Sequence, residues 1–574
     1  MTNKLQELLK EKSVILLDGA MGTMLQWEGL QPGERPELFL LEHPDIVTEI
    51  HKAYLNSGSN LLYTCTFGAN RRKLSGTGHT PSEVIHAAVQ AAKAAADSYS
   101  GRRPLIALDI GPIGEMMYPS GMLHFEEAYD IFREVVIAGE EAGADLVVFE
   151  TMTDLGEIRA AVLAARENTS LPVMTTMTFE ENGRTFTGCT AEAMAYTMDG
   201  MGVDALGVNC SLGPEKLYPI AERIAACTDL PLIVKANAGL PDPVDNTYHL
   251  LPEDFALQME KFSALGVRLA GGCCGTTPDF IRALQKRFEN LDPIVRKKKA
   301  AICSPLHTIF PNEIHVIGER INPTGKKELQ QALLEQDMDV ITEFGMDQAD
   351  AGAELLDVNL GYPGVEEAVL MKLSVEELQS VCKLPLVIDS ADPAVLEAGL
   401  RAFHGIAIAN SVTGEKTSLE RILPVVKKYG AFVIGLTMDE KGIPQTAEER
   451  LAIAEKIVNT AEKYGIAREK ILIDCLTCPV GAQQDQPSET LRAVRLAKEQ
   501  LGVGTVLGVS NVSYGMPERE TLNRSFLSAA LENGLNFAIL NPNEESLMDT
   551  ITSWKTLHGL DPDAAGYLER FGKR

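Results

Sequence analysis

Three cysteines lie where two short apolar segments of the chain end, and their number suits metal-assisted thiol chemistry. Cys210 ends the segment 205–211, and the adjacent pair Cys273 and Cys274 ends the segment 269–275. Three thiolates suit zinc, a borderline-soft ion that prefers tetrahedral sulfur and nitrogen ligands, and they leave its fourth position open for a substrate. A substrate thiol that enters this position loses its proton and becomes a nucleophile at neutral pH.

Glycines flank the adjacent pair of cysteines. Neighbouring residues in a regular strand point to opposite faces, so both thiols reach one metal only if the backbone leaves the pleat. Gly271, Gly272 and Gly275 permit that departure. The competing interpretation is that these cysteines are buried packing residues, which are common and inert. The three cysteines alone leave both interpretations open.

A second set of polar residues follows apolar segments in the other half of the chain. Carboxylates accept hydrogen bonds in pairs from a guanidine-like edge, and asparagines both donate and accept. Such a set suits a reduced pterin better than a phosphate, because glycine-rich phosphate loops and basic clusters are lacking. Aspartate and asparagine also end strands for conformational reasons alone, so the whole set is more informative than any one member. Its members are Glu319, Asn322, Asp357, Asn359, Asp389, Asn410, Asp474, Asn511 and Arg519.

The other cysteines are interpreted without a metal. Cys475 and Cys478 have the C-x2-C spacing of metal ligands, but no second C-x2-C or histidine pair accompanies them. We assign them to the rim of the second polar set. Packing roles are expected for Cys189, Cys227, Cys303 and Cys382.

The elements that must position these residues form two series of eight short apolar segments. Stretches with apolar residues at helical spacing, such as 124–142 and 154–167, separate them. Eight strand–helix units predict a (β/α)8 barrel, in which chemistry gathers at the carboxyl ends of the strands. The first series predicts strands at 14–20, 61–67, 104–111, 145–151, 172–179, 205–211, 231–239 and 269–275. The second predicts strands at 314–321, 355–359, 385–390, 405–411, 431–437, 471–477, 505–511 and 537–542.

We therefore expect an α/β protein with two tandem TIM-type (β/α)8 barrels, over residues 1–290 and 314–550. The segment 291–313 has prolines, a basic cluster and no periodicity, which predicts a linker with its RKKK run (296–299) in solvent. Residues 551–574 are expected to form a polar helical tail.

Composition narrows the class of protein. The 574 residues carry a formal charge of −28, so no basic excess is present to neutralise nucleic-acid phosphates. No apolar run is long enough to cross a membrane, and the first residues lack the features of a signal peptide. The ten cysteines are too sparse for a disulfide framework. These observations predict a cytoplasmic enzyme that binds neither nucleic acid nor membranes.

The first half resembles the homocysteine-binding domain of zinc-dependent homocysteine methyltransferases. The motifs that carry the resemblance are DGAMGT (18–23), VNCSLGP (208–214), KANAGLP (235–241) and GGCCGTTP (271–278). It implies that Cys210, Cys273 and Cys274 are the zinc ligands, and that Asn237 approaches the zinc when homocysteine is absent. It further implies that Asp18 and Glu150 lie near the homocysteine ammonium.

One position departs from that family. The family usually has T-N-T-F after the second strand, whereas this chain has Thr64-Cys65-Thr66-Phe67. Cys65 either takes over a polar contact or is a fourth thiol near the site, and the sequence leaves this open.

The second half resembles the pterin-binding domain of methyltetrahydrofolate:corrinoid methyltransferases and of cobalamin-dependent methionine synthases. The matching motifs are GERIN (318–322), LDVN (356–359), IDS (388–390), IANS (408–411) and GVSN (508–511). The resemblance implies that Asp389, Asn410 and Asp474 hold the pterin ring. It places Asn511 near N5 and Arg519 at the border of the pocket.

Together the two resemblances imply 5-methyltetrahydrofolate:homocysteine methyl transfer. The methyl group would pass from folate N5 to cob(I)alamin, and then from methylcobalamin to zinc-bound homocysteine thiolate, giving methionine. None of the ten histidines lies in the Asp-x-His-x-x-Gly motif of the cobalamin-binding module, so another module or a separate corrinoid protein would supply the cobalamin.

Other activities fit the sequence less well. A homocysteine methyltransferase with another methyl donor would not need the second barrel, whereas a methyltetrahydrofolate methyltransferase acting on a separate corrinoid protein would use it. Pteroate synthesis would require a lysine-bearing site that the strand-end motifs lack. An open three-thiolate site is poorly suited to zinc storage.

Overall fold

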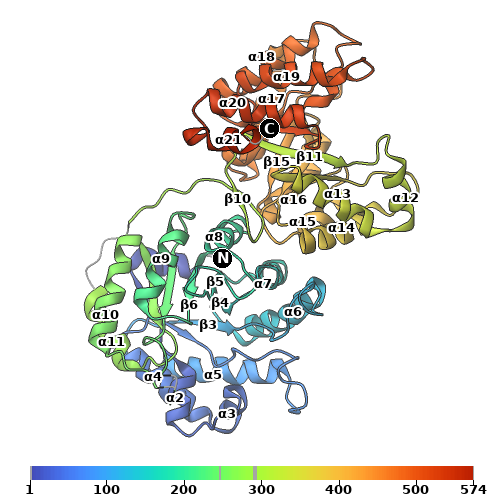
Figure 1. Ribbon diagram of the computed structural model, residues 1–574. Coiled ribbons are helices and arrows are strands. Elements are labelled where there is room, and N and C mark those ends of the chain that lie inside the picture. The colour runs from blue at the N-terminus through green and yellow to red at the C-terminus, as the bar shows by residue number, and fades with distance from the viewer. Residues whose placement is uncertain (1–2, 243, 245–246, 289–293, 573–574) are drawn as a thin grey trace. The chain divides into compact units, whose positions relative to one another are not determined.

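The computed structural model of the protein describes residues 3–242, 244, 247–288 and 294–572. The chain forms two compact units, Met1–Lys298 and Lys299–Arg574 (Figure 1). Each unit is built around eight parallel strands that alternate with helices. The predicted architecture of two tandem (β/α)8 barrels is therefore confirmed.

In the first unit, each of the eight predicted segments contains or overlaps a strand. The strands are β1 (Ile15–Leu16), β2 (Leu61–Tyr63), β3 (Leu105–Ile110), β4 (Leu146–Met152), β5 (Val173–Met177), β6 (Ala205–Asn209), β7 (Leu232–Ala236) and β8 (Val267–Gly272). The helices are α1 (Lys4–Glu11), α2 (Met21–Trp27), α3 (Pro36–Glu42), α4 (Pro44–Asn56), α5 (Pro81–Ser98), α6 (Phe125–Ala142), α7 (Leu155–Asn168), α8 (Ala191–Gly200), α9 (Pro214–Ala225), α10 (Pro252–Glu260) and α11 (Pro278–Phe288), with the 3-10 helix η1 (Lys261–Leu265).

The interior of the first barrel is filled by alternate residues of its strands. Pairs two positions apart, such as Leu105 with Ala107, point to the same side of a strand and share one buried cluster. Leu5, Leu8 and Leu9 of α1 belong to the same cluster. The amphipathic first helix therefore closes the barrel at the amino ends of the strands and leaves the opposite end for chemistry.

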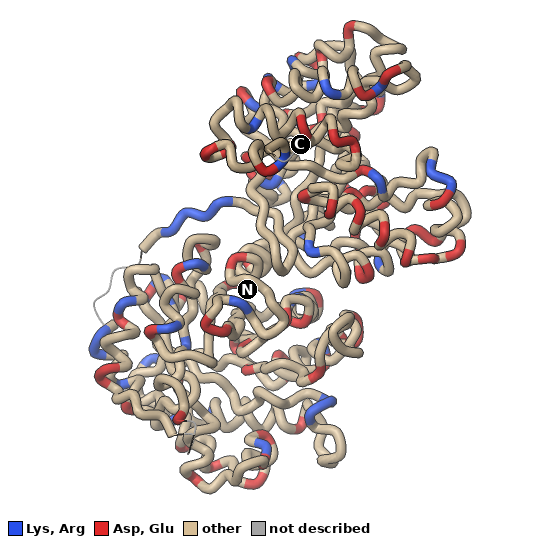
Figure 2. Tube along the Cα trace, viewed as in Figure 1, with Lys and Arg blue, Asp and Glu red and all other residues tan. Residues whose placement is uncertain are grey.

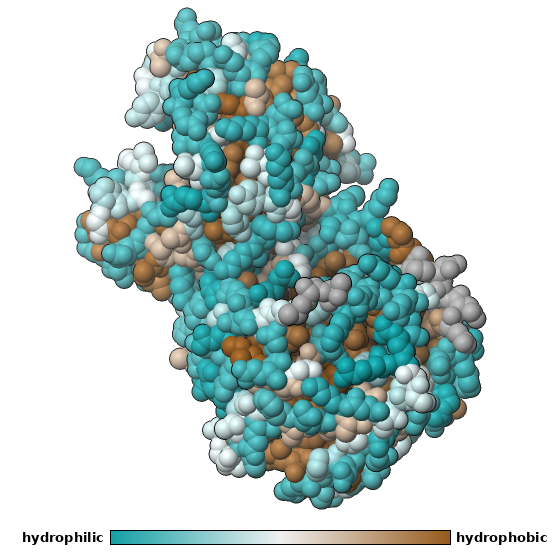
Figure 3. Space-filling model, turned by 180° about the vertical axis from the view of Figure 1, so that it is seen from behind, coloured by the Kyte–Doolittle hydropathy of each residue, from teal (hydrophilic) through white to brown (hydrophobic). Residues whose placement is uncertain are grey.

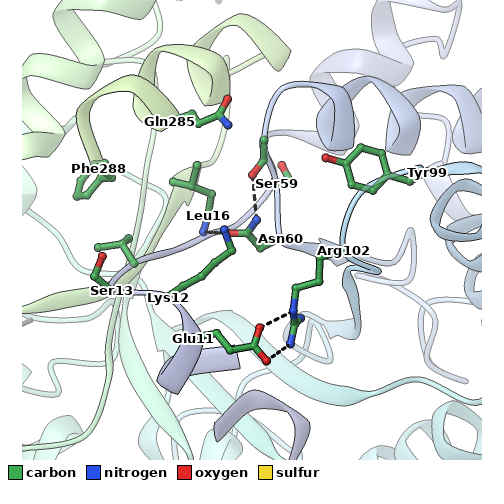
Figure 4. A pocket seen from close by; sticks show the side chains of 12 residues that line it. Glu11, Lys12, Ser13, Leu16, Ser59, Asn60, Tyr99, Arg102, Gln285 and Phe288 are labelled. Carbon is green, nitrogen blue, oxygen red and sulfur yellow. Dashed lines mark hydrogen bonds and ion pairs between the residues drawn. The ribbon is translucent and has the colours of Figure 1, made fainter. Parts of the chain in front are cut away.

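Side chains join β1 to β2, the two ends of the first sheet. The Asn60 amide N–H donates to the Leu16 carbonyl at 2.7 Å, and Leu16 N–H donates to Asn60 Oδ1 at 3.1 Å (Figure 4). Near the carboxyl end, Tyr63 N–H donates to Asp18 Oδ2 at 2.7 Å. Asp18 thus helps to close the ring and, as described below, faces the pocket.

Helix ends carry the local signals that capping predicts. Asp154 accepts hydrogen bonds from Gly156 N–H and Glu157 N–H at the start of α7. Thr446 and Glu449 form a capping box at the start of α17 (Ala447–Lys463) in the second unit. Gly143, with φ 84°, ends α6 in the left-handed conformation that glycine tolerates.

The second unit is a closed barrel whose strands pair in chain order. They are β11 (His315–Ile321), β12 (Leu355–Asn359), β13 (Leu386–Asp389), β14 (Ile408–Thr413), β15 (Phe432–Leu436), β16 (Ile471–Asp474), β17 (Gly504–Gly508) and β18 (Phe537–Leu540). The α-helices are α12 (Lys327–Glu335), α13 (Met338–Asp350), α14 (Glu367–Val381), α15 (Pro393–Ala402), α16 (Lys416–Tyr429), α17 (Ala447–Lys463), α18 (Gln486–Leu496), α19 (Arg519–Glu532), α20 (Glu545–Leu557) and α21 (Ala565–Phe571). Short helical turns are η2 (Arg468–Lys470), η3 (Ala497–Leu501), η4 (Val509–Ser513) and η5 (Pro562–Ala564).

The segment expected to be a linker contains regular structure. β9 (Ile302–Cys303) and β10 (Thr308–Ile309) form an antiparallel pair, and Cys303 exchanges backbone hydrogen bonds with Ile406 just before β14. Strands this short have no readable apolar period, which is why the sequence pattern misses them. Part of the expected linker, 291–293, lies outside the described residues.

Lysine and arginine are blue in Figure 2, where the basic run 296–299 stands out as a continuous blue stretch. Arg296 is half-buried and donates to the carbonyls of Thr228, Leu230, Leu265 and Gly266 in the first unit. Lys298 pairs with Asp199 at 2.6 Å and Asp229 at 2.9 Å but stays exposed, like Lys297 and Lys299. The three lysines therefore agree with the expected solvated run, whereas Arg296 is bound to the first barrel.

The chain after β18 is helical, as expected, but α20 begins at Glu545, before the predicted start of the tail. Among the described residues, no helix is long and apolar enough to cross a membrane. On the face shown in Figure 3, apolar residues form separate patches within a largely hydrophilic surface.

Candidate functional site

The three predicted cysteines meet at the carboxyl ends of β6 and β8. Their sulfur atoms all lie within 4.8 Å of one another, and Cys210 Sγ is 3.8 Å from Cys274 Sγ. Within the described part of the chain, this is the one group of three or more histidine, cysteine or acidic residues with metal-binding spacing. The structure therefore brings together the residues that the sequence selected, although Cys210 lies 63 positions before Cys273 in the chain.

Backbone geometry explains how the adjacent pair serves one site. Cys210 has φ 62°, and Gly275 after the cysteine pair has φ 79°, so the chain turns sharply at both strand ends. Cys210 N–H donates to Lys235 O at 2.9 Å, and Cys273 N–H donates to Ala236 O at 2.7 Å. The β7 backbone, lying between β6 and β8, thus fixes both cysteine-bearing turns.

Two further polar residues lie beside the thiols. Asn237 follows β7, and its buried Oδ1 has no hydrogen-bond partner among the described residues. The ring of Tyr248 packs against Gly275 so closely that a Cβ there would lie 2.3 Å from Tyr248 Cγ. Burial and the nearby Cys274 and Cys210 raise the pKa of Tyr248. Tyr248 was not predicted from the sequence, because it lies in a polar loop without a motif.

A pocket of about 270 Å³ opens beside the cysteines. Its wall includes all three thiols together with Asp18, Glu150, Lys235, Tyr63 and Asp109. The predicted acidic pair therefore lines the same cavity as the predicted metal ligands. Its volume suits a small molecule such as an amino acid.

A buried lysine stands between the predicted carboxylates. Lys235 Nζ lies 3.4 Å from Asp18 Oδ1, 3.6 Å from Glu150 Oε2 and 3.6 Å from the Tyr63 ring centroid. Burial lowers the pKa of Lys235, but the charges of Glu150 and Asp18 raise it by more than burial lowers it. The resulting pKa is well above the ordinary value of a lysine. Burial raises the pKa of both Asp18 and Glu150, and Lys235 opposes that rise. The sequence analysis quoted Lys235 within a motif without assigning it a role.

Glu150 reaches the pocket through an irregularity of its strand. The β4–β5 register shifts between Phe149 and Met152, and Thr151 has φ 60°. Asn209 accepts from Thr151 N–H at 2.9 Å and donates to Thr151 Oγ1 at 2.8 Å. A bulge of this kind redirects a side chain toward a site.

Asp109 adds a third carboxyl group that the sequence analysis did not select. It is buried at the end of β3, and its Oδ1 has no hydrogen-bond partner among the described residues. Burial and then the charge of Glu150 raise its pKa well above the ordinary value. Asp109 therefore tends to hold a proton, which limits the negative charge of the pocket.

Cys65 lies in the same pocket but outside the thiol group. Its Sγ donates to the Pro36 carbonyl at 3.6 Å, and burial raises its pKa well above the ordinary thiol value. The geometry supports the polar-contact interpretation for Cys65.

In the second barrel, four predicted residues form one hydrogen-bonded set at neighbouring strand ends. Asn359 Nδ2 donates to Asp389 Oδ2 at 2.9 Å, and Asn410 Nδ2 donates to Asp357 Oδ1 at 3.3 Å. Burial and the charge of Asp389 raise the pKa of Asp357 well above the ordinary value, and burial also raises that of Asp389. Buried carboxylates of this kind are stabilised by a ligand that presents N–H donors.

Asp474 ends β16 and is a separate buried acceptor. Its Oδ1 accepts from Leu476 N–H at 2.7 Å, and burial raises its pKa to about 7. Among the described residues, no hydrogen bond joins its carboxylate to the set on β12, β13 and β14.

The remaining predicted residues lie on β11 and around η4. Ser510 Oγ donates to Glu319 Oε1 at 3.2 Å, while Arg519 donates to Ser510 O at 2.8 Å and to Ser513 Oγ at 3.0 Å. Arg519 therefore holds the turn that carries the exposed Asn511. Asn322 Oδ1 accepts from Thr324 N–H at 3.0 Å and stabilises a turn.

The C-x2-C segment surrounds a buried arginine. Arg450 donates to Cys475 O at 2.9 Å, Thr490 Oγ1 at 2.7 Å and Gln486 Oε1 at 2.5 Å, and its Nη2 lies 4.0 Å from Cys478 Sγ. A guanidinium at this place repels a metal cation, so the segment is suited to shaping the loop after Asp474. The sequence analysis did not select Arg450.

Two family models match the chain in tandem. Residues 15–288 match Homocysteine S-methyltransferase, and residues 318–541 match Pterin binding enzyme. Methionine synthase of Mycobacterium tuberculosis is 31% identical over 576 aligned residues, covering 94% of this chain and 48% of that protein. Methionine synthase of Mycobacterium leprae is also 31% identical, covering 92% of this chain and 47% of that protein.

A solved structure also resembles the first half. The homocysteine methyltransferase MmuM from Escherichia coli, in its metallated form, is 26% identical, covers 50% of this chain and 100% of that chain, and has a TM-score of 0.44. The chain itself spans about half the length of the curated relatives it matches. The chain therefore joins, in tandem, a segment similar to the homocysteine S-methyltransferase family and a segment similar to the pterin-binding enzyme family.

Proposed function

We propose that this chain is the substrate-binding part of a cobalamin-dependent methionine synthase. A methyl group would move from N5 of 5-methyltetrahydrofolate, held by the second barrel, to a corrinoid carrier, and from there to the sulfur of homocysteine in the first barrel. The observation that carries the proposal is the group of three thiols within 4.8 Å at the mouth of a barrel of the homocysteine S-methyltransferase family.

The donor set fits a zinc ion. Cys210, Cys273 and Cys274 would hold it, because three converging thiolates match its preference and leave a fourth position. Zinc would supply Lewis acidity that keeps the homocysteine sulfur deprotonated at neutral pH. The buried, unpartnered Oδ1 of Asn237, on the segment that follows β7 between the two cysteine-bearing strands, would supply a neutral oxygen when no substrate is bound.

The acidic wall of the pocket would orient the amino acid. Asp18 and Glu150 line the pocket and would present carboxylate oxygens to the homocysteine ammonium. Binding of the ammonium at one end would fix the direction of the thiol at the other. Such orientation lowers the entropic part of the barrier.

The second barrel would hold the folate by its pterin edge. Asp357, Asp389 and Asp474 accept from N–H donors, and Asn359 and Asn410 orient two of these carboxylates. N5 is a poor leaving group unless it gains a proton, so a hydrogen-bonding partner is needed there. Asn511 would stabilise the protonated amine, with the proton delivered through water, because an amide is not an acid at neutral pH.

The corrinoid would come from another domain or protein. The ten histidines of this chain lie outside the Asp-x-His-x-x-Gly motif. The proposal therefore predicts that the chain performs each half reaction only when cobalamin is supplied.

Matched variants of the two barrels test the proposal. The zinc content is measured by elemental analysis, and the binding of homocysteine and methyltetrahydrofolate by calorimetry, in wild type, Cys273→Ser and Asp389→Ala. Cys273→Ser should lose zinc and homocysteine binding but keep folate binding. Asp389→Ala should lose folate binding but keep zinc and homocysteine binding.

Each result has a distinct meaning. Wild-type protein that binds homocysteine without metal would overturn the role of the cysteines. Wild-type protein that binds homocysteine but not the folate would instead favour a homocysteine methyltransferase with another donor. Methyl transfer with supplied cobalamin then checks that both sites are catalytic.

A further inference from the structure

The buried ammonium of Lys235 is a charged group of the first barrel that the proposed reaction does not use. The side chain is 4% exposed and lies on β7, within the apolar sequence LIVKA. Burying an ammonium group is unfavourable unless opposite charges surround it. A methionine or leucine would fill the same space without that cost, so stability alone does not account for a lysine here.

The contacts of Lys235 divide its charge between two carboxylates. Its Nζ lies 3.4 Å from Asp18 Oδ1 and 3.6 Å from Glu150 Oε2, longer than the 2.7–2.9 Å of a tight charge-assisted hydrogen bond. The Tyr63 ring lies on another side of the ammonium, 3.6 Å away at its centroid. The lysine therefore holds both carboxylates without saturating either one.

The other contacts of these carboxylates leave room for a ligand. Asp18 Oδ2 accepts from Tyr63 N–H, which fixes the plane of that carboxyl group. Glu150 contacts both Asn209 and Lys235 through Oε2, so these contacts leave Oε1 for another donor. Both carboxyl groups line the pocket that also contains the three thiols.

The backbone of the same residue supports the thiol end of the pocket. Lys235 O accepts from Cys210 N–H at 2.9 Å. One residue thus connects the turn that carries a thiol to two carboxylates that line the same cavity. A ligand that contacts both the thiol group and the carboxylates needs a metal-binding atom such as a thiol and a cationic group such as an α-ammonium.

We propose that Lys235 is a positioning residue that makes the pocket selective for a thiol bearing an α-ammonium group. It keeps Asp18 and Glu150 side by side by offsetting their mutual repulsion, and it acts on the substrate through them. This inference rests on the proposed binding of homocysteine in the first barrel.

Two thiols that differ only in the ammonium group test this role. Homocysteine and 4-mercaptobutanoate, its desamino counterpart, are titrated into zinc-loaded wild-type protein and Lys235→Met by calorimetry. Wild type should prefer homocysteine by about tenfold or more, because a buried ion pair is lost with the desamino thiol. Lys235→Met should reduce this preference to about threefold or less, with unchanged zinc content and little change in affinity for 4-mercaptobutanoate.

A double-mutant cycle with Asp18→Asn identifies the route of the effect. If Lys235 acts through Asp18, adding Lys235→Met to Asp18→Asn should weaken homocysteine binding less than it does in wild type. Should Lys235→Met fail to fold, Lys235→Gln retains N–H donors for both carboxylates while removing the charge, and the preference should fall in the same direction.

The possible outcomes separate this inference from the proposed function. An unchanged preference for homocysteine in the variants would overturn the positioning role while leaving the proposed function intact. A variant that binds homocysteine and 4-mercaptobutanoate equally weakly and also loses zinc would overturn the positioning role as well, since the lysine would then be structural. Wild-type protein that binds neither thiol would overturn the proposed function itself.

Discussion

Cys210 Sγ lies 3.8 Å from Cys274 Sγ, although the two residues belong to different strand–helix units. That separation is close to the distance between two sulfur ligands of a tetrahedral zinc ion with bonds of about 2.3 Å. The two sulfur atoms reach this separation because backbone hydrogen bonds to β7 hold the turns that carry the cysteines. The fold thus holds these two thiols at the separation that zinc ligands require.

The first prediction concerns the metal affinity of this group. Cys273→Ser should lower the affinity for zinc by more than about 100-fold. Losing a residue that only hydrogen-bonds to a metal ligand costs about 10–100-fold in affinity, and losing the ligand itself should cost more. Competition with a chelator followed by elemental analysis measures this. Cys65→Ser is the matched control, because Cys65 lines the same pocket outside the thiol group. Equal zinc loss in the control would make Cys65 a ligand.

The second prediction concerns Asn511. Asn511→Ala should slow methyl transfer from the folate by about 10²-fold or more, because the protonated N5 loses a stabilising partner. Folate affinity should change much less, since the carboxylates of the pocket remain. Single-turnover rates with supplied cob(I)alamin, together with calorimetric folate titrations, separate the two effects. A rate equal to that of wild type would remove Asn511 from the mechanism.

The third prediction is a pH dependence of stability. Burial raises the pKa of Asp474 to about 7 from 3.8, so between these pH values the folded protein keeps a proton that the unfolded chain has released. The contribution of Asp474 to the free energy of unfolding therefore falls as the pH rises from about 4 to 7, and it is constant above that range. At about 1.4 kcal/mol per pKa unit, ionising Asp474 costs about 4 kcal/mol above pH 7.

Asp474→Asn, which does not ionise, should be stabilised relative to wild type by more at pH 8 than at pH 5.5. Urea unfolding at the two pH values measures the difference. The exposed Asp485→Asn is the matched control for replacing an aspartate by asparagine. A constant difference between Asp474→Asn and wild type would show that Asp474 ionises freely in the folded protein.

The fourth prediction concerns the buried Arg450. Its guanidinium serves the carbonyl of Cys475 and the side chains of Thr490 and Gln486. Arg450→Met would leave these acceptors unpaired, so the free energy of unfolding should fall by about 3 kcal/mol. Urea unfolding checks this against Arg492→Met, whose solvent-exposed ion pairs should contribute much less to stability. Comparable losses in the two variants would contradict a structural role for Arg450.

Much of the fold followed from apolar runs. Strands buried on both faces are continuous apolar segments, and the polar or glycine residue after each one is visible in the sequence. The cysteines and strand-end carboxylates could be selected for the same reason, since strand ends of a barrel share one face. The short β9–β10 pair lacked any such pattern.

The contacts within the sites depended on features that no local pattern encodes. Glu150, Glu319 and Asn410 lie at register shifts of their strands, where a bulge decides the direction of a side chain. The pairing of Lys235 with Asp18 requires β1 and β7 to flank β8, although they are distant along the chain. A lysine within an apolar strand was the one available signal, since such a residue needs a buried partner.

Arg296 also changes how the protein can be dissected. A gene fragment that ends at residue 290 would encode the strands and helices of the first barrel but would omit the guanidinium that binds four of its carbonyls. It would also omit Lys298, which pairs with Asp199 and Asp229. An autonomous first barrel should therefore extend through Lys298, and the shorter fragment should unfold at a lower temperature despite containing the whole pocket.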